Sequence, residues 1–280
     1  MNTVAEAISE AARSLASQSD SPRLDAELLL GKILGLSRTG LIARSNQPAS
    51  DESLQAFARL IEERRRGTPV AYLTGTREFW SLALHVTPAV LVPRPETEIL
   101  VDLALQRLPE DSQCSILDLG TGSGAIALAI AAERPLSQVT GTDISAAALE
   151  VAKRNARELE LSRVDWRLGS WFAPVAGQRF DMIVSNPPYI AAADPALEKL
   201  TAEPAIALCD GPTGLEALAT IAAGSGAHLR GRGWLLLEHG SSQGPDVARL
   251  LHAHGFTSVR SHPDFSGKLR VTLGTLHSPP

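Results

Sequence analysis

The chain has 280 residues, 44% of them hydrophobic and 20% charged, which is enough apolar material to bury a sizeable core and excludes disorder as the main state. Its formal net charge of −5 argues against a protein that holds duplex DNA on a broad phosphate-binding face. The two cysteines, Cys114 and Cys209, form no Cys-x-x-Cys pair, which argues against a disulfide scaffold or a zinc site. We find no signal peptide and no apolar stretch of about 20 residues, so we expect a soluble, cytoplasmic protein.

The first third of the chain is predicted to be helical. Apolar residues recur at helical spacing over residues 4–15. Ser21-Pro22 is typical of an N-cap followed by proline at the first helical position, and Gly35 ends that helix. A further helix begins near Ser50-Asp51 and closes at Gly67. Residues 1–84 are therefore predicted to form an all-helical domain. It carries no recognisable chemistry, and we expect it to dock the substrate.

The last of these helices ends in a run of three arginines, Arg64, Arg65 and Arg66. Basic residues are favourable at a helix C-terminus, where they meet the negative end of the dipole. The run is also compatible with a docking patch for an RNA-containing or acidic partner. The sequence leaves both interpretations open.

After Gly67 the pattern becomes extended. Residues 79–86 and 90–92 have β character, and they predict a linker hairpin over about 76–92. From Glu96 onward helices and strands alternate, with strands expected at 115–119, 138–143, 164–168, 180–184, 234–238, 256–260 and 269–273. The predicted fold class is therefore α/β, a doubly wound, mostly parallel seven-stranded sheet over residues 85–280.

A glycine-rich loop lies between the first of these strands and the next helix. It comprises Gly120, Thr121, Gly122, Ser123 and Gly124. Glycines let the backbone turn tightly and approach a ligand, and the helix N-terminus beyond offers unpaired N–H groups. The pattern fits a dinucleotide loop as well as an S-adenosylmethionine loop.

Two acids accompany the loop. Asp143 ends the following strand and is placed to hold ribose hydroxyls with either ligand. Asp118 precedes the loop; a carboxylate there repels a pyrophosphate but suits the cationic amino group of a methionine moiety. We therefore favour S-adenosylmethionine over NAD.

The strand at 180–184 runs into Asn186-Pro187-Pro188-Tyr189. This segment lies at the carboxyl edge of the sheet, where open α/β folds bind their ligands. The nitrogen of a planar amide or exocyclic amine is a poor nucleophile, because its lone pair is delocalised. The side-chain oxygen of Asn186 and the carbonyl of Pro187 can accept its two N–H groups and stabilise the positive charge that develops on methylation. Two prolines stiffen the loop, Tyr189 offers a face for a planar group, and no metal is needed.

These motifs resemble the release factor glutamine methyltransferases (the PrmC/HemK family). The nucleotide loop with Asn-Pro-Pro-Tyr is shared more widely by amino-methyltransferases acting on adenine, cytosine and glutamine. The narrower match lies in residues 67–80 and above all in Pro93-Arg94-Pro95-Glu96-Thr97-Glu98, where the related ribosomal-protein glutamine methyltransferases differ. Residues 237–244 and 264–271 resemble the family's C-terminal segment. The resemblance covers nearly the whole chain from Gly67.

The resemblance implies S-adenosylmethionine-dependent methylation of the side-chain amide of the glutamine in the Gly-Gly-Gln motif of class 1 peptide chain release factors. It implies that Asn186, Pro187 and Tyr189 are catalytic, and that Asn186, Pro187, Pro188 and Tyr189 contact the substrate. The implied cofactor contacts are the five loop residues with Asp143, Trp171 and Asn186. Family members often have an acid before the residue matching Trp171, where this chain has Ser170, and Glu203-Pro204 lacks the usual preceding arginine.

Three other functions remain open. The first is an adenine-specific methyltransferase acting on a flipped DNA base, which would normally need a basic target-recognition region. The second is a glutamine methyltransferase acting on a ribosomal protein. The third is a noncatalytic binding protein, which the intact Asn186-Pro187-Pro188-Tyr189 segment disfavours. No stable nucleic-acid partner, no membrane partner and no metal are expected.

Overall fold

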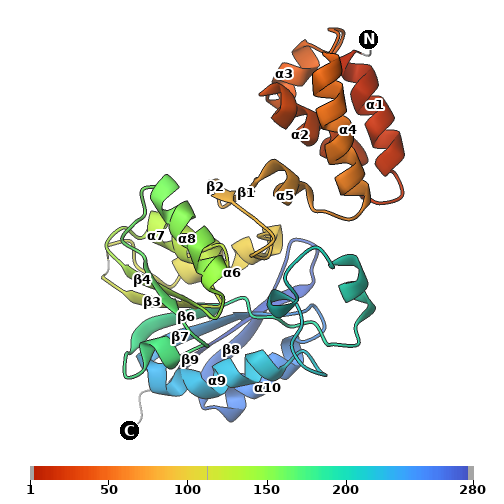
Figure 1. Cartoon of the computed structure of the whole chain (residues 1–280). Coiled ribbons are helices and arrows are strands. Elements are labelled where there is room, and N and C mark those ends of the chain that lie inside the picture. The colour runs from red at the N-terminus through yellow and green to blue at the C-terminus, as the bar shows by residue number, and fades with distance from the viewer. Residues whose placement is uncertain (1–2, 112, 277–280) are drawn as a thin grey trace. The chain divides into compact units, whose positions relative to one another are not determined.

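The computed structural model describes residues 3–111 and 113–276 and divides into two compact units (Figure 1). The helical unit comprises Met1–Thr76 and Lys199–Ala202, and the sheet unit comprises Arg77–Glu198 and Glu203–Pro280. Each has an apolar core of its own. Within the described residues, no helix is long and apolar enough to cross a membrane.

In its described residues, the helical unit contains five helices around one apolar cluster. Its helices are α1 (Val4–Leu15), α2 (Pro22–Leu34), α3 (Arg38–Ala43), α4 (Asp51–Arg65) and α5 (Val70–Thr74). The three predicted helices are confirmed as α1, α2 and α4. The short helices α3 and α5 were not anticipated, because five or six residues are too few to establish a helical period.

The predicted helix caps occupy the expected positions. Gly35 ends α2 in the left-handed conformation, and the hydroxyl of Ser50 accepts the N–H of Ser53 at 3.2 Å. Ser21 occupies the N-cap position of α2, but its side chain makes no capping bond. Its hydroxyl donates to the carboxylate of Asp25, 3.4 Å away. The predicted positions of the N-cap and of the proline are confirmed.

The arginines that close α4 have acidic partners within the helical unit. Arg64 forms a partly buried ion pair with Asp25 at 2.8 Å, and Arg65 and Arg66 both pair with Glu62. This favours their structural interpretation over a free basic patch.

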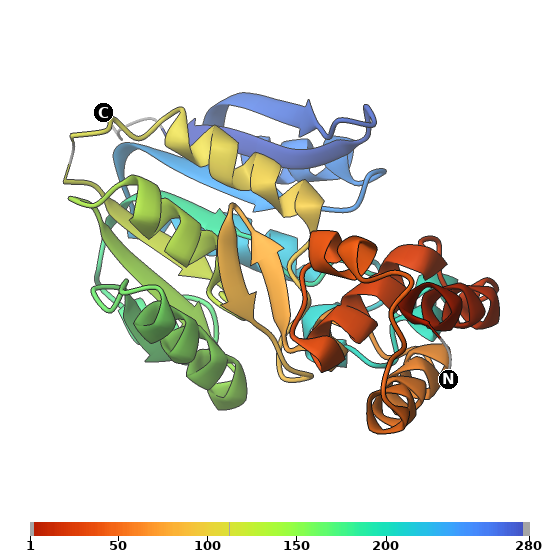
Figure 2. The ribbon, with the colours of Figure 1, turned by 90° about the horizontal axis from the view of Figure 1, so that it is seen from above.

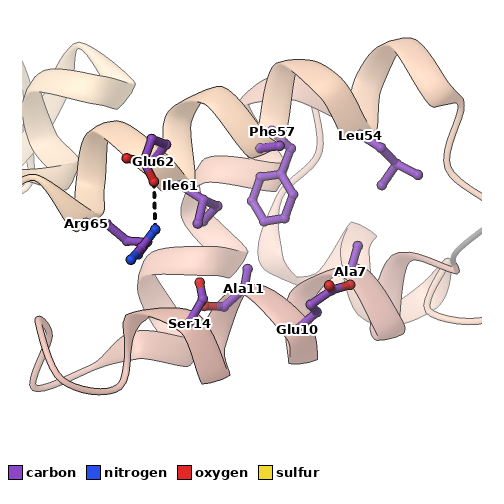
Figure 3. A pocket seen from close by; sticks show the side chains of 10 residues that line it. Ala7, Glu10, Ala11, Ser14, Leu54, Phe57, Ile61, Glu62 and Arg65 are labelled. Atoms are coloured by element: carbon purple, nitrogen blue, oxygen red, sulfur yellow. Dashed lines mark hydrogen bonds and ion pairs between the residues drawn. The ribbon is translucent and has the colours of Figure 1, made fainter.

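A groove of about 310 Å³ lies between α1 and α4 (Figure 3). Apolar side chains line its floor, among them Ala11, Phe57 and Ile61. Charged side chains of Glu10 and Arg65 stand at its edge.

The sheet unit is built on one seven-stranded sheet of order β5-β4-β3-β6-β7-β9-β8. Its strands are β3 (Ser115–Leu119), β4 (Gln138–Asp143), β5 (Asp165–Leu168), β6 (Phe180–Ser185), β7 (Leu229–Glu238), β8 (Phe256–Pro263) and β9 (Leu269–Leu276). The five from β3 to β7 are parallel, while β9 runs antiparallel to both β7 and β8. The predicted fold class is confirmed.

Helices cover both faces of this sheet (Figures 1 and 2). They are α6 (Glu98–Leu105), α7 (Ala125–Glu133) and α8 (Ala146–Glu158) on one face, and α9 (Glu216–His228) and α10 (Gly244–Ala253) on the other. Alternate strand residues supply the two cores, because successive side chains of a strand point to opposite faces. Thus Ile116 and Val184 pack with α6 and α7, whereas Leu117 and Ile183 pack with α9 and α10.

The hairpin is shorter than the sequence suggested. It consists of β1 (Thr76–Phe79) and β2 (Leu82–His85), and residues 90–92 form no strand. Its two turn residues, Trp80 and Ser81, have φ of 51° and 60°. Positive φ at both positions is the geometry of a type I′ turn, usually signalled by Asn-Gly, so Trp-Ser concealed the turn inside an apparently continuous strand.

Candidate active site

The sheet register places the predicted site residues at one edge. Leu119, the last residue of β3, pairs with Thr142 on one side and with Ser185 on the other. Ser185 in turn pairs with Leu237 of β7. The residues that follow these four, Gly120, Asp143, Asn186 and Glu238, therefore lie along the carboxyl edge of four neighbouring parallel strands. Ligands bind at this edge in open α/β sheets.

The glycine-rich loop needs its glycines for conformation and for space. Gly120 has φ of +69° and Gly124 has φ of +82°, a region that other residues rarely adopt. A Cβ on Gly124 would lie 2.9 Å from the ring of Trp166, and one on Gly120 would lie 3.7 Å from the ring of Trp171. The loop backbone therefore packs tightly against Trp166 at Gly124, whereas at Gly120 there is room between the backbone and Trp171.

Asp143 holds the loop in place as well as lining the cavity. Its Oδ2 accepts the N–H of Gly122 at 2.8 Å, and its Oδ1 accepts the N–H of Ser145, also at 2.8 Å. Burial raises the pKa of this carboxyl, and the backbone donors oppose that rise. Each oxygen has a further lone pair with which it can accept from a hydroxyl.

Asp118 does not reach the cavity as the sequence suggested. It is fully buried beneath the loop, where its Oδ2 accepts the hydroxyl of Thr121 at 2.5 Å. Its Oδ1 has no hydrogen-bond partner among the described residues. Because Asp118 is buried and bonded to Thr121, it supports the loop from within and does not line a ligand surface. Burial raises the pKa of this carboxyl to about 7.

A cavity of about 220 Å³ opens beside the loop. Its lining brings together the predicted residues Gly120, Asp143, Trp171, Asn186 and Pro188 with others from the segments beyond β4, β5 and β6, namely Ile144, Gly169, Ser170, Ile206, Ala207, Cys209 and Asp210. A smaller cavity of about 60 Å³ shares Gly120 and Asn186 with the first and adds Thr121, Gly122, Ser123, Leu91, Pro93, Arg94, Thr97, Ala125 and Ile126. Gly124, Pro187 and Tyr189 belong to neither lining.

The Asn-Pro-Pro-Tyr segment is fixed at both ends. The hydroxyl of Ser185 donates to the carbonyl of Leu119 at 2.7 Å, and the side chain of Gln243 donates to the carbonyl of Tyr189 at 3.1 Å. Burial raises the pKa of the Tyr189 phenol to about 12, so it stays neutral. Asn186 donates from Nδ2 to the hydroxyl of Thr97 at 3.1 Å.

Two family models match the chain. One is described as the PrmC N-terminal domain and matches residues 6–75, and the other as the methyltransferase small domain and matches residues 96–210. The release factor glutamine methyltransferase of Xylella fastidiosa (strain Temecula1) is 51% identical over 254 residues, covering 90% of this chain and 92% of that protein. The one from Escherichia coli (strain K12) is 46% identical over 91% of this chain and 93% of that protein. The chain belongs to the release factor glutamine methyltransferase family.

A solved structure agrees with this family in fold. A 16S rRNA methyltransferase of Thermus thermophilus, in complex with AdoMet and guanosine, superposes with a TM-score of 0.55 at 20% identity, over 72% of this chain and 50% of that chain. The likeness at this identity concerns the sheet and its covering helices alone.

The Pro-Arg-Pro-x-Thr-Glu segment, which suggested the family, is tied to distant parts of the sheet unit. Arg94 forms an ion pair of 2.5 Å with the buried carboxylate of Glu203, which also accepts the N–H of Val92 at 3.0 Å. Glu98 accepts the N–H of Trp80 at 2.9 Å and so fastens the hairpin turn. The Glu203-Pro204 pair that this chain retains thus anchors the loop after Asn186, even without the usual preceding arginine.

Sequence reasoning missed Thr97 and Glu238, both buried next to Asn186. Thr97 lies 89 residues before Asn186, and Glu238 ends a different strand. No local sequence pattern therefore joins either of them to Asn186. A usable signal was present for Glu238, since it is an acid at the end of the apolar run Leu235-Leu236-Leu237. His239 has a structural place, with Nε2 lying 2.8 Å from the Thr272 hydroxyl.

Proposed function

We propose that this chain transfers a methyl group from S-adenosylmethionine to the side-chain amide nitrogen of the glutamine in the Gly-Gly-Gln motif of class 1 peptide chain release factors. The observation that carries the proposal is the position of Asn186. Asn186 lines both cavities beside the glycine-rich loop. The family to which the chain belongs indicates the class of reaction.

The residues at the loop fit S-adenosylmethionine. In the larger cavity, the ring of Trp171 suits the adenine and the carboxylate of Asp143 suits the ribose of S-adenosylmethionine. The loop backbone at Gly120 suits the close approach of its methionine part. Ser170, which replaces the more usual acid, leaves adenine recognition to Trp171 and to backbone groups. When bound, S-adenosylmethionine supplies an electrophilic methyl group on a sulfonium. Among the described residues, no group of three or more His, Cys, Asp or Glu side chains is placed to hold a metal.

The chain's own residues act on the amide of the substrate. The Oδ1 of Asn186 and the carbonyl of Pro187 each accept one N–H of the glutamine side chain and so aim its nitrogen. As the N–C bond forms and the S–C bond breaks, positive charge appears on that nitrogen, and both acceptors stabilise it. One N–H proton then leaves to solvent, which restores a neutral amide. Pro188 limits the motion of the loop, and the ring of Tyr189 borders the planar group.

The helical unit is proposed to dock the folded release factor. It contributes no residue to the linings of either cavity, and it presents the groove between α1 and α4, with Phe57 at its floor and both signs of charge at its edge (Figure 3).

A labelled-methyl assay tests the proposal. The purified protein is incubated with tritiated S-adenosylmethionine and one of three acceptors: an unmethylated class 1 release factor, the same factor with its motif glutamine changed to alanine, or duplex DNA. We expect label on the first acceptor alone. Label on DNA would instead identify an adenine methyltransferase, and label on a ribosomal protein in a parallel reaction would place the chain in the related glutamine methyltransferase group.

A further inference from the structure

Glu238 is a buried carboxyl at the end of the strand next to that of Asn186. It is the last residue of β7, and it is 1% exposed. The sheet register pairs Ser185 with Leu237, so Asn186 and Glu238 follow one another across neighbouring strands. Hydrogen bonding from the side chains of Thr97 and Asn186 lowers the pKa of this carboxyl and favours its ionised form. A carboxyl at this depth is costly unless neighbouring donors use it, yet nothing in the proposed reaction so far requires it.

Thr97 connects Glu238 to Asn186. It ends the short 3₁₀ helix η1 (Pro95–Thr97) and is 4% exposed. Its hydroxyl lies 3.1 Å from the Nδ2 of Asn186. A hydroxyl has one proton to donate and lone pairs with which to accept. The direction of its single proton therefore decides which end of the Asn186 amide it can meet.

The ionised carboxylate sets that direction. It can only accept, so the Thr97 O–H points to Glu238, and the oxygen of Thr97 is left to accept from Asn186. Asn186 must then present Nδ2 to Thr97 and Oδ1 to the cavities that it lines. We propose that Glu238, acting on Asn186 directly and through Thr97, is a positioning residue that holds the Asn186 amide with its oxygen towards the substrate glutamine.

A flipped Asn186 would present its NH₂ group to the NH₂ group of the substrate. Two donors would then meet, and the acceptor that stabilises the developing positive charge would be lost. The two orientations of an amide have nearly the same shape, so packing alone does not choose between them. A buried acceptor at a fixed position does.

The charged groups around Glu238 bear on its ionisation. Arg270 favours the charged form, whereas Glu96 opposes it, and the neutral phenol of Tyr189 lies close by. Burial raises the pKa of Glu238 to about 7, which leaves a substantial ionised fraction near neutral pH.

The inference rests on the proposed function and is tested with single-turnover methylation of a release factor by the full-length protein. Glu238→Gln keeps the shape of the side chain but introduces an amide that can donate to Thr97. The Thr97 hydroxyl is then free to donate to Asn186 or to accept from it, so both orientations of the Asn186 amide become possible. Thr97→Val removes the hydroxyl that links the two side chains, and Thr97→Ser keeps that hydroxyl. We expect the first two to lower the single-turnover rate by about 10- to 100-fold, as when a partner that orients a ligating side chain is removed. Thr97→Ser should retain a rate within about threefold of wild type.

Two further measurements separate positioning from a purely structural role. The affinity for S-adenosylmethionine, measured by calorimetry, should be unchanged in all three variants. In an Asn186→Ala background, Glu238→Gln should cause no further loss of rate, because its effect passes through the Asn186 side chain. Thr140→Val, a buried hydroxyl deletion on β4, is the matched control and should leave the rate unchanged.

The outcomes are distinct. If the wild-type protein does not methylate the factor, the proposed function fails before any variant is compared. If wild type is active and Glu238→Gln or Thr97→Val keeps its rate, or if Glu238→Gln slows the Asn186→Ala protein by its full factor, the positioning role is wrong. Should Glu238→Gln fail to fold, Thr97→Val and its serine rescue decide the question alone.

Discussion

Asp143 shows how one side chain can serve both the loop and its ligand. Its two oxygens already accept the N–H groups of Gly122 and Ser145, which fixes the carboxylate before any ribose hydroxyl arrives. Such preorganisation reduces the ordering that binding must still achieve.

We expect Asp143→Ala to weaken S-adenosylmethionine binding by about 10- to 100-fold, since a hydrogen bond to a charged group contributes about 1.5–3 kcal/mol. The variant should also melt at a lower temperature, because the Gly122 N–H loses its acceptor. Calorimetric titration measures the affinity, and Asp165→Ala, an exposed acid of β5, is the control. Unchanged affinity would remove Asp143 from the ligand site.

Asn186→Ala deletes one of two acceptors for the substrate amide. Loss of such a preorganised contact lowers turnover by about 10²–10³, or about 3–4 kcal/mol. Asn186→Asp should be severely impaired as well, because it replaces the Nδ2 that faces Thr97 with an acceptor and sets a second carboxylate near Glu238. Both proteins should fold and take up cofactor. Turnover within a few-fold of wild type for Asn186→Ala, in single-turnover assays beside a thermal melt, would refute the assignment of this segment.

At the scale of elements, periodicity and capping signals predicted the helices and strands that have a regular pattern. All seven strands of the main sheet were predicted, because strands and helices alternate regularly along that part of the chain. The hairpin was misplaced because Trp80 and Ser81 gave no turn signal. Distant side chains hold Trp80 in this turn, since Glu98 accepts its backbone N–H and Glu133 accepts its indole N–H. Likewise β7 begins at Leu229, well before the predicted strand, since two glycines and two exposed arginines conceal its first half.

The same distinction applies to the candidate site. Strand ends could be assembled from sequence, because parallel strands share a carboxyl edge, and the sheet register does bring Gly120, Asp143 and Asn186 there. Contacts between side chains from distant segments, such as those of Thr97 and Glu203, could not be predicted from the sequence. The burial of Asp118 also escaped prediction, because the alternation of faces leaves open whether the end of a strand is covered.

The loop that follows Asn186 depends on one buried carboxylate. Glu203 holds both Arg94 and the Val92 N–H, and residues Ile206 and Cys209 of the same loop line the larger cavity. Glu203→Gln cannot satisfy both donors, so we expect it to destabilise the protein by about 1–3 kcal/mol. Cofactor affinity should fall with it. Chemical denaturation and calorimetry measure the two effects, and Glu198→Gln on the exposed helix η3 (Pro195–Lys199) should show neither. An intact affinity in a destabilised protein would show that the loop does not shape the cavity.

At the scale of the whole molecule, the two fully buried carboxyls make stability depend on pH. The folded-state pKa of Asp118 and of Glu238 is about 7 in each case, above the ordinary values of 3.8 and 4.5. Between the unfolded-state and the folded-state pKa values, the folded protein binds more protons than the unfolded chain. The free energy of unfolding therefore falls as the pH rises through this range.

We therefore expect the melting temperature to fall as the pH is raised from about 5 to about 8. Asp118→Asn and Glu238→Gln cannot ionise, so each should show a shallower fall than wild type. Scanning fluorimetry across this pH range measures the slopes. Equal slopes in wild type and both variants would mean that neither carboxyl titrates in this window.

The two-unit organisation leads to a last prediction, on the purpose of the helical unit. Every residue that lines the two cavities belongs to the sheet unit. A protein truncated to residues 77–280 should therefore bind S-adenosylmethionine with unchanged affinity. Its methylation of a folded release factor should be slower through a raised KM, because a docking surface contributes binding energy and takes no part in the chemical step. A short peptide that carries the Gly-Gly-Gln motif is the matched substrate, and the truncated and full-length proteins should methylate it equally well. If both proteins methylate the whole factor with the same KM, the helical unit does not dock it.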